Sequence, residues 1–382
     1  MKILITTDLF ATSTNGVVTS VKNLWDELQK KGHDVQILTL SDTRYSHKED
    51  NVTYIRSLPI GVYPDVRMPT SYRHHLIREI VDWKPDVIHS QCEFFSFQFA
   101  KYISKMTGAP IVHTYHTLYE QYISYVIPFE RFGKWLVRIL TQKRLRHVHT
   151  LIVPTHKAEN TLRKYDVDKP IYVIPSGICL EQHRLRLTAE ERREKRHSLG
   201  VAEDQIVLLN LGRLGSEKNL EELIRFFAAA AREHSNLSFL IVGGGPARTQ
   251  LEELARSLGV ADSVIFAGMV KPSEVQYWYQ LGDVFVSAST SETQGLTYIE
   301  AAANGLPLLC RRDDCLQDVI LQGENGYEYS VESEFIACLT AIANDPEWRR
   351  SAGKRSEEIS GSFDKSAFGV AVETVYRAVT KM

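Results

Sequence analysis

The chain has 382 residues, which is about twice the size of a typical single domain and favours two domains. Its composition, with 43% hydrophobic and 24% charged residues, is ordinary for a globular protein. The formal net charge of -2 excludes a general attraction to nucleic acid, so any basic binding surface must be local.

The first residues and the cysteines indicate the compartment. Residues 2–6 are predicted to form a strand with no signal-peptide pattern before it, so we expect a cytoplasmic protein. No run of about 18 consecutive apolar residues occurs, so we expect any membrane contact to come from one side. The five cysteines have no CxxC spacing and are expected to be reduced thiols.

Short strands rich in Val, Ile and Leu alternate with helical segments, a pattern typical of parallel sheets with crossover helices. In the first half the predicted strands are 2–6, 34–40, 86–89, 110–113 and 150–154, with a helix over 18–31. In the second half they are 206–211, 237–242, 263–266, 283–287 and 306–310, with helices over 220–233 and 249–258. The sequence therefore predicts an α/β protein of two doubly wound, Rossmann-like domains.

The domain boundary is predicted near the linker that precedes a charged segment. Residues 1–175 are assigned to an amino-terminal domain and 176–361 to a carboxyl-terminal domain, which the family resemblance described below implies to be the acceptor-binding and the nucleotide-sugar-binding domain. The last segment, 362–382, is predicted to be a helix that packs back on the first domain. The charged segment 178–199 is predicted to be a solvated helix beside the linker. The two domains are expected to face a central cleft, with ligands at the carboxyl ends of the strands.

Two strand-to-helix loops have features of phosphate binding. Gly16 follows the first strand and would let the backbone approach a phosphate or a sugar at a helix amino terminus, although a plain turn explains it equally well. Arg213 and Lys218 follow the strand 206–211 and place a guanidinium and an ammonium in one loop. Two such charges suit a diphosphate leaving group, and the alternative is a pair of solvated surface charges.

A glycine-rich segment, residues 243–245, follows the next strand of the second half. A dinucleotide-binding motif is not favoured, because Pro246 replaces the GxGxxG continuation and no suitably spaced acidic residue follows. We interpret the segment as a tight turn near a nucleotide.

The strongest indication of a binding site is the segment 291–300, with the sequence Ser-Glu-Thr-Gln-Gly-Leu-Thr-Tyr-Ile-Glu. It follows the predicted strand 283–287. If a helix begins near Gly295, then Glu292 lies in the loop and Glu300 lies on the first turns. The free amides of Gly295, Leu296 and Thr297 would point at a pyrophosphate. Glu300 could then accept ribose hydroxyls and Glu292 sugar hydroxyls, whereas the alternative is a helix-terminal charge and a solvated face.

The loop with Arg213 and Lys218, combined with the motif from Glu292 to Glu300, resembles retaining glycosyltransferases of family 4, which have the GT-B fold. The resemblance runs from the first strand to about residue 350. Within the family, the segments 291–298 and 113–122 are most similar to bacterial 1,2-diacylglycerol 3-glucosyltransferases.

The resemblance implies a role for each site residue. Arg213 and Lys218 are implied to bind the donor diphosphate. Glu300 is implied to bind the ribose, and Glu292 the transferred sugar. The backbone at Gly295, Leu296 and Thr297 is implied to contact the phosphates, and Gly16 to close over the phosphates. His116 matches the family histidine that contacts the donor sugar near the reacting centre. The base is expected to contact the backbone around Met269 and Val270.

The resemblance also implies a reaction: retaining transfer of a hexose, with UDP-glucose as the expected donor, to a membrane lipid such as diacylglycerol, giving an α-glycolipid without a cofactor. No His, Cys or carboxylate cluster has metal-ligand spacing. Asp166 and Asp168 lie in a polar loop, which we interpret as a solvated turn. We therefore predict a metal-independent enzyme.

The segment Arg131–Arg146 is basic and carries interleaved apolar residues. It can lie in the headgroup layer of an anionic membrane, or it can be a core helix whose basic side is solvated. We favour the membrane and expect a protein peripheral on the inner face. The tyrosines Tyr115, Tyr119, Tyr122 and Tyr125 could hold acyl chains or sugar faces, or pack as an aromatic core.

Other classes of protein fit the sequence less well. A nicotinamide-dependent dehydrogenase lacks its dinucleotide motif, and a two-lobed periplasmic sugar-binding protein would need an export signal. A phosphatidylinositol mannosyltransferase or a polysaccharide-assembly glycosyltransferase using another nucleotide sugar shares the donor-pocket motifs and stays the main alternative. The sequence leaves the donor sugar, the base and the acceptor open.

Overall fold

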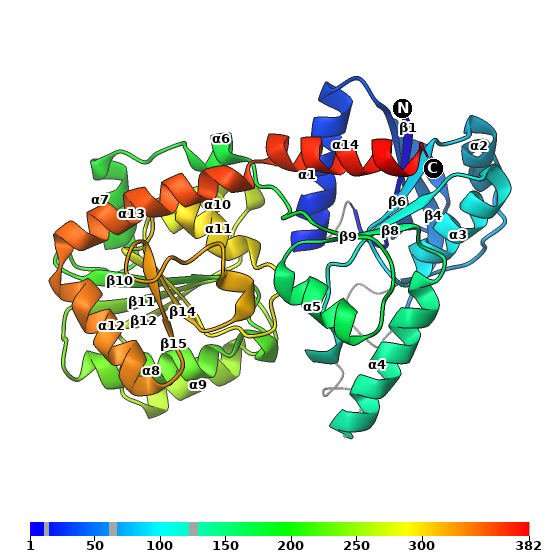
Figure 1. Cartoon of the computed structure of the whole chain (residues 1–382). Coiled ribbons are helices and arrows are strands. Elements are labelled where there is room, and N and C mark those ends of the chain that lie inside the picture. Colours follow the sequence, from blue (N-terminus) through cyan, green and yellow to red (C-terminus); the bar gives the residue numbers. More distant parts are fainter. Residues whose placement is uncertain (11–14, 61–66, 122–128, 382) are drawn as a thin grey trace. The chain divides into compact units, whose positions relative to one another are not determined.

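The computed structural model describes residues 1–10, 15–60, 67–121 and 129–381 (Figure 1). They form two compact units. Unit 1 consists of Met1–Ile178 and Lys365–Met382, and unit 2 consists of Cys179–Asp364. Unit 1 is therefore discontinuous in sequence, because the chain leaves it for unit 2 and returns for the last helix.

Unit 1 is built on a sheet that has nine strands within the described residues. The strands are β1 Lys2–Thr6, β2 Asp34–Ser41, β3 His47–Glu49, β4 Val52–Pro59, β5 Arg67–Pro69, β6 Val87–Ser90, β7 Ile111–Thr114, β8 Thr150–Val153 and β9 Ile171–Val173. Their order is β3-β4-β2-β1-β6-β7-β8-β9, with β5 paired to β4. All neighbours are parallel except β3 and β5, which run antiparallel to β4.

Helices cover both faces of this sheet, as expected for parallel strands. They are α1 Gly16–Lys30, α2 His75–Trp83, α3 Phe95–Thr107, α4 Glu130–Leu145, α5 His156–Lys164 and α14 Lys365–Val379. Alternate residues of β1 point to opposite faces, so Ile3 and Ile5 pack with α1 and α14, whereas Leu4 packs with residues of α2 to α5.

The carboxyl-terminal helix α14 lies against α1 (Figure 1). Glycines permit the close approach: a Cβ on Gly177 would lie 2.5 Å from the Cα of Lys365, and one on Gly369 would lie 2.8 Å from the Cβ of Glu27. The amide of Lys365 donates a hydrogen bond of 2.9 Å to the carbonyl of Ile178. The last helix is thus an integral part of the core of unit 1.

Unit 2 holds a parallel sheet whose described strands follow the order β12-β11-β10-β13-β14-β15. The strands are β10 Ile206–Leu211, β11 Leu237–Val242, β12 Val264–Gly268, β13 Val284–Ser287, β14 Leu308–Arg311 and β15 Gly326–Tyr329. The helices are α6 Leu180–His183, α7 Ala189–Ser198, α8 Leu220–Ala231, α9 Arg248–Ser257, α10 Val275–Tyr279, α11 Leu296–Ala303, α12 Glu332–Asn344 and α13 Pro346–Ser360. Residues of α8, α9 and α12 form the core on one face of this sheet.

The charged segment before β10 folds as α7 and is tied to the sheet. Thr188 caps α7 in a capping box with Glu191. Arg192 and Arg196 reach Asp283, next to β13, with N···O distances of 2.8 and 2.5 Å. The prediction of a solvated helix is therefore wrong for this side of α7, because an acidic residue distant in sequence pairs with its arginines.

The observed strands agree with the sequence where the apolar run is continuous. The bounds of β1, β10 and β11 are those that the sequence predicts. In contrast, β4, β9 and β15 lie in segments where the sequence predicts no strand. Three of the last four residues of β4 are exposed, β9 has three residues, and β15 is GYEY. No helix within the described ranges has the length and hydrophobicity of a membrane-spanning segment.

Candidate functional sites in the two units

In unit 2, two predicted site residues meet because their strands are neighbours. β10 pairs with β13, so the loops that follow these strands lie side by side at the carboxyl edge of the sheet. Lys218 follows β10, Glu292 follows β13, and the Lys218 ammonium forms an ion pair with Glu292 Oε1. Ser289 Oγ donates a hydrogen bond of 2.9 Å to the same oxygen.

The loop after β10 is held by its own backbone. Residues Ser216–Lys218 form a single 3-10 turn, and Asn219, with φ of 51°, is the cap residue that precedes α8. Ser291 Oγ donates a hydrogen bond of 3.1 Å to the carbonyl of Glu217, which ties this loop to the one after β13. Arg213 lies exposed on the same loop.

The helix α11 begins where the sequence predicts. Gly295 has φ of 74° and precedes Leu296, the first residue of the helix. The amides of the first turn have no carbonyl partner within the helix, so Gly295, Leu296 and Thr297 can present N–H groups to an anion. A Cβ on Gly295 would lie 2.3 Å from the ring of Tyr298, so both the backbone angle and the space require glycine here.

Glu300 lies on α11, and Tyr279 of α10 donates a hydrogen bond of 2.8 Å to its Oε2. Burial raises the pKa of the Glu300 carboxyl to about 7, and the hydrogen bond from Tyr279 opposes that shift. The sequence alone does not identify Tyr279, because the contact depends on how α10 packs against α11.

The glycine-rich loop after β11 packs backbone against backbone. A Cβ on Gly243 would lie 1.8 Å from the carbonyl oxygen of Gly212, and one on Gly245 would lie 2.3 Å from that of Leu214. The amide of Gly243 donates to the carbonyl of Gly268 at the end of β12, one residue before Met269, whose side chain is 81% exposed. These glycines let the loops that follow β10, β11 and β12 lie close together. Val270 lies in the loop after β12.

Unit 1 has a second polar cluster at the carboxyl ends of β1, β6 and β7, which are neighbouring strands. His116 follows β7, and its Nε2 lies 2.7 Å from Oε1 of Gln91, which follows β6. Burial lowers the pKa of His116 to about 4, so the imidazole is neutral at pH 7.

Glu93 is the buried acid of this cluster. Its Oε1 lies 3.4 Å from Nε2 of His113, and its Oε2 accepts a hydrogen bond of 2.5 Å from the hydroxyl of Tyr119. Burial raises the pKa of Glu93, but His113 and Tyr119 outweigh burial and bring the pKa below its ordinary value. The sequence assigns His113 to the core, and the structure adds an acidic partner to that buried side chain.

Asp8 follows β1 and accepts a hydrogen bond of 2.6 Å from the amide of Ser96, in the first turn of α3. Burial raises the pKa of Asp8 to about 6. Gly16, at the start of α1, is exposed.

Gln91 directly follows the buried strand β6, and Glu93 lies in the same loop two residues later. Their position after a buried strand is the feature of the sequence that could have identified them. Of the predicted tyrosine cluster, Tyr115 is 1% exposed and lies in the core, while Tyr122 and Tyr125 lie outside the described residues.

The helix α4 carries two apolar stripes. Val137 and Leu145 are buried in the core of unit 1. In contrast, Phe132, Trp135 and Ile139 are 54%, 53% and 37% exposed. At about 100° per residue, these three lie on the side of the helix opposite the buried stripe. A core position therefore does not account for this second apolar stripe.

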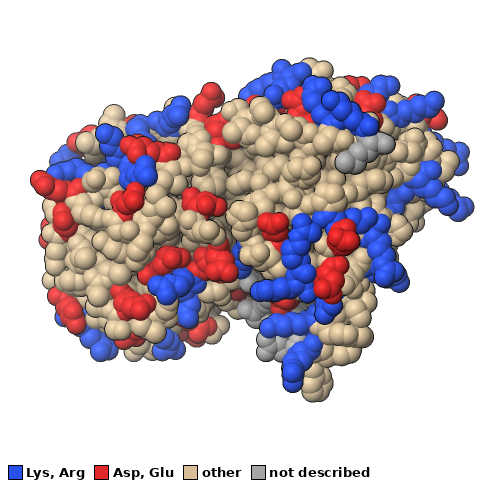
Figure 2. Space-filling model, viewed as in Figure 1, with Lys and Arg blue, Asp and Glu red and all other residues tan. Residues whose placement is uncertain are grey.

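Six basic residues lie along α4, and Figure 2 shows Lys and Arg on this part of unit 1. They are Arg131, Lys134, Arg138, Lys143, Arg144 and Arg146. Arg138 forms an ion pair with Asp166, which has φ of 52° in the turn after α5. The predicted turn at Asp166 is thus confirmed.

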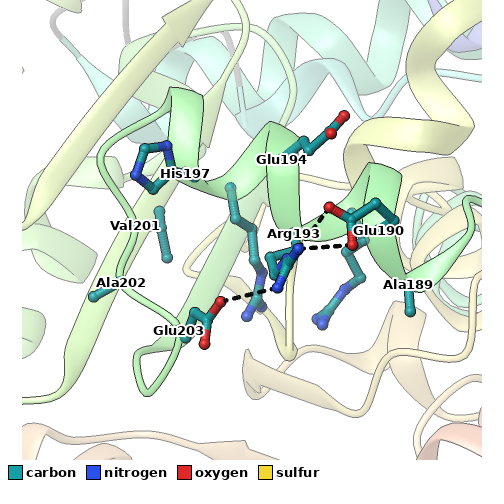
Figure 3. A pocket seen from close by; sticks show the side chains of 10 residues that line it. Ala189, Glu190, Arg193, Glu194, His197, Val201, Ala202 and Glu203 are labelled. Atoms are coloured by element: carbon teal, nitrogen blue, oxygen red, sulfur yellow. Dashed lines mark hydrogen bonds and ion pairs between the residues drawn. The ribbon is translucent and has the colours of Figure 1, made fainter.

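A pocket beside α7 is lined by charged side chains that pair with one another (Figure 3). Arg193 donates two hydrogen bonds, of 2.6 and 2.8 Å, to Glu190 and lies 3.6 Å from Glu203. Its arginines are thus engaged by neighbouring acids, and the pocket contains none of the predicted site residues.

Two family models match the chain: Glycosyltransferase Family 4 over residues 14–182 and Glycosyl transferases group 1 over residues 191–359. The chain is 34% identical to the Alpha-monoglucosyldiacylglycerol synthase of Streptococcus pneumoniae, over 91% of this chain and 79% of that protein. It is 30% identical to the protein of the same name from Acholeplasma laidlawii, over 98% of this chain and 96% of that one.

The fold is shared with the solved structure of Anabaena Alr3699/HepE in complex with UDP-glucose. The TM-score is 0.76 at 16% sequence identity, and the match covers 99% of this chain and 100% of that one. Two Rossmann-like α/β domains with parallel sheets are the units of the GT-B class of glycosyltransferases. The chain belongs to glycosyltransferase family 4. The predicted fold and family are both confirmed.

Proposed function

We propose that the chain transfers glucose from UDP-glucose to diacylglycerol at a membrane surface, with retention at the anomeric carbon, giving an α-glycolipid. The observation that carries the acceptor assignment is the exposed apolar and basic face of α4. The names of the two relatives described above support a diacylglycerol-type acceptor, and the sugar bound by the solved neighbour supports the donor.

In this proposal unit 2 binds the donor. Lys218 and Arg213 neutralise the negative charge that grows on the diphosphate as the glycosidic bond breaks. The first-turn amides of α11, from Gly295 to Thr297, contact the same phosphates.

The remaining donor contacts are assigned to the two glutamates and to the end of β12. Glu300 accepts the ribose hydroxyls, and Glu292 accepts hydroxyls of the sugar while it stays paired with Lys218. The backbone near Val270 contacts the base. Because the protein supplies positioning and charge stabilisation, the leaving phosphate itself can take the acceptor proton, and no enzymic nucleophile is required.

Unit 1 is proposed to supply the acceptor side. His116 contacts the donor sugar near the reacting centre, and Gly16 approaches the phosphates. The exposed stripe of α4 enters the headgroup layer while its basic residues pair with anionic lipid. The protein would then be peripheral on the inner face of the cell membrane.

The test is a panel of UDP- and GDP-sugars, incubated with the protein and with or without vesicles that contain diacylglycerol. We expect release of UDP and a new glycolipid only with UDP-glucose and diacylglycerol, and an α-anomeric proton in its NMR spectrum. Transfer to phosphatidylinositol or to a soluble glycan instead would replace this function with the main alternative.

The reaction is further proposed to be independent of metal. We expect the initial rate to be unchanged in excess EDTA. Loss of the rate, with recovery on adding Mg²⁺ or Mn²⁺, would contradict this.

A further inference from the structure

Gln91 is a buried amide between two imidazoles, with 2% of its surface exposed. Its Oε1 lies 2.7 Å from Nε2 of His116, and its Nε2 lies 3.2 Å from each ring nitrogen of His89. The amide thus directs its oxygen to one histidine and its nitrogen to the other.

The second histidine is itself fixed by two hydroxyls. His89 is fully buried, with Nδ1 at 2.5 Å from the Tyr376 hydroxyl and Nε2 at 2.7 Å from Oγ1 of Thr114. Tyr376 belongs to α14 and is 287 residues away in sequence. A rigid, buried group therefore holds the nitrogen end of the Gln91 amide.

We propose that Gln91 is a positioning residue that fixes the tautomer of His116, so that His116 carries its proton on Nε2 and presents Nδ1 to the substrate as a hydrogen-bond acceptor. An amide oxygen can only accept, so the nitrogen that faces it must be the N–H. A neutral imidazole has one N–H, so the lone pair is then on Nδ1.

Burial is the main reason that the imidazole of His116 is neutral. Burial and the neighbouring His113 lower the pKa of His116 to about 4, although the carboxylate of Glu93 opposes them. Protonation of Nδ1, which would remove the acceptor, is therefore suppressed at neutral pH. An uncharged Gln91, unlike a carboxylate at that place, leaves this balance undisturbed.

The inference rests on the proposed function, in which His116 contacts the donor sugar, and it specifies that contact. An Nδ1 acceptor selects a hydroxyl group, which can donate, and disfavours a phosphate oxygen, which cannot. His116 therefore recognises a sugar hydroxyl, and Gln91 sets the direction of that hydrogen bond.

The tautomer is measured directly in the full chain labelled with ¹⁵N-histidine, with the His116 signals assigned by their loss in His116→Gln. We expect the Nε2–H pattern at pH 7 in the wild type and a mixture of both tautomers in Gln91→Leu. An Nδ1–H pattern in the wild type, or an unchanged pattern in Gln91→Leu, overturns the inference.

The kinetic test uses the isosteric variant Gln91→Glu, with the exposed Gln29→Glu on α1 as the matched control. A carboxylate opposite Nε2 stabilises the imidazolium, so we expect kcat of Gln91→Glu to fall about tenfold as the pH drops from 8 to 5.5. The wild type and Gln29→Glu should stay flat across this range. A Gln91→Glu profile that superimposes on the wild type contradicts the inference.

Failure of the proposed contact between His116 and the donor sugar can be distinguished from failure of the inference about Gln91. If His116→Ala keeps wild-type activity, the assigned contact with the donor sugar is wrong, whereas the NMR pattern still decides whether Gln91 fixes the tautomer. In Gln91→Leu, we expect kcat to fall about 100-fold with an unchanged Kd for UDP. A change confined to the thermal unfolding midpoint would reduce Gln91 to a structural role.

Discussion

Lys218 and Glu292 form an ion pair between two loops, although the residues are 74 positions apart in sequence. Their side chains are 29% and 16% exposed, so the pair is partly shielded from water. The cation assigned to the diphosphate and the carboxylate assigned to the sugar thus hold each other in place.

Removal of this cation should act mainly on the chemical step. For Lys218→Met we expect kcat to fall about 100- to 1,000-fold, the usual cost of losing one preorganised charge at a developing anion. The control is Arg193→Met, which removes an ion-paired cation on α7. Steady-state rates with saturating donor check the prediction, and a loss below threefold would remove Lys218 from the reaction.

Gly295→Ala should destabilise unit 2 more than its backbone angle alone explains. Gly32 has φ of 77° with no atom within 4 Å of an added Cβ, whereas Gly295 has φ of 74° with the Tyr298 ring at 2.3 Å. Gly32→Ala therefore reports the strain of the left-handed backbone, about 1–2 kcal/mol. Thermal unfolding of both variants isolates the steric contribution, and equal shifts would show that the ring of Tyr298 moves aside freely.

The ligand-free protein should lose stability as Glu300 ionises. Because burial raises its pKa from 4.5 to about 7, the folded state holds this proton more tightly than the unfolded chain does. That stabilisation is complete below about pH 4.5 and is lost as the pH rises through 7. We expect the unfolding midpoint of Glu300→Gln to exceed that of the wild type increasingly from pH 5 to 8, and parallel profiles would contradict the shift.

The exposed stripe of α4 should decide membrane binding. Replacing Phe132 and Trp135 with serine removes two aromatic side chains, each worth about 1.5–3 kcal/mol on full burial, so we expect vesicle affinity to fall at least tenfold. The control is Tyr45→Ser, since Tyr45 is an exposed aromatic of unit 1 outside α4. Cosedimentation with anionic vesicles at low salt measures the change. Equal recovery of both variants, or equal binding of the wild type to neutral vesicles, would disprove the role of α4.

The sequence predicts those features that a continuous apolar run or a loop motif determines. β10 and β11 are buried on both faces, so their residues are almost all apolar and their bounds follow from composition. The start of α11 follows from Gly295, which ends the loop with a backbone angle that other residues rarely adopt. In contrast, β15 contains Glu328 and two tyrosines and becomes a strand only by pairing with β14.

Contacts between side chains of different elements are harder to predict. The sequence places Lys218 and Glu292 in loops after strands, but their pairing depends on β10 and β13 being neighbours. Tyr279 and Gln91 act on Glu300 and His116 through packing that no local pattern specifies. Which apolar residues of α4 are buried and which are exposed is seen only in the structure, because both sides of the helix are apolar in sequence.

The discontinuity of unit 1 has a consequence for synthesis on the ribosome. The helix that carries Tyr376 follows unit 2 in the chain, so it is translated after unit 2, yet it packs on the sheet that contains β1. Until all of unit 2 has been translated, the cluster that contains Ile3, Ile5 and Val21 therefore lacks the residues that α14 adds to it. A nascent chain stopped at residue 364 would expose this apolar face, which makes such fragments natural clients of chaperones and proteases.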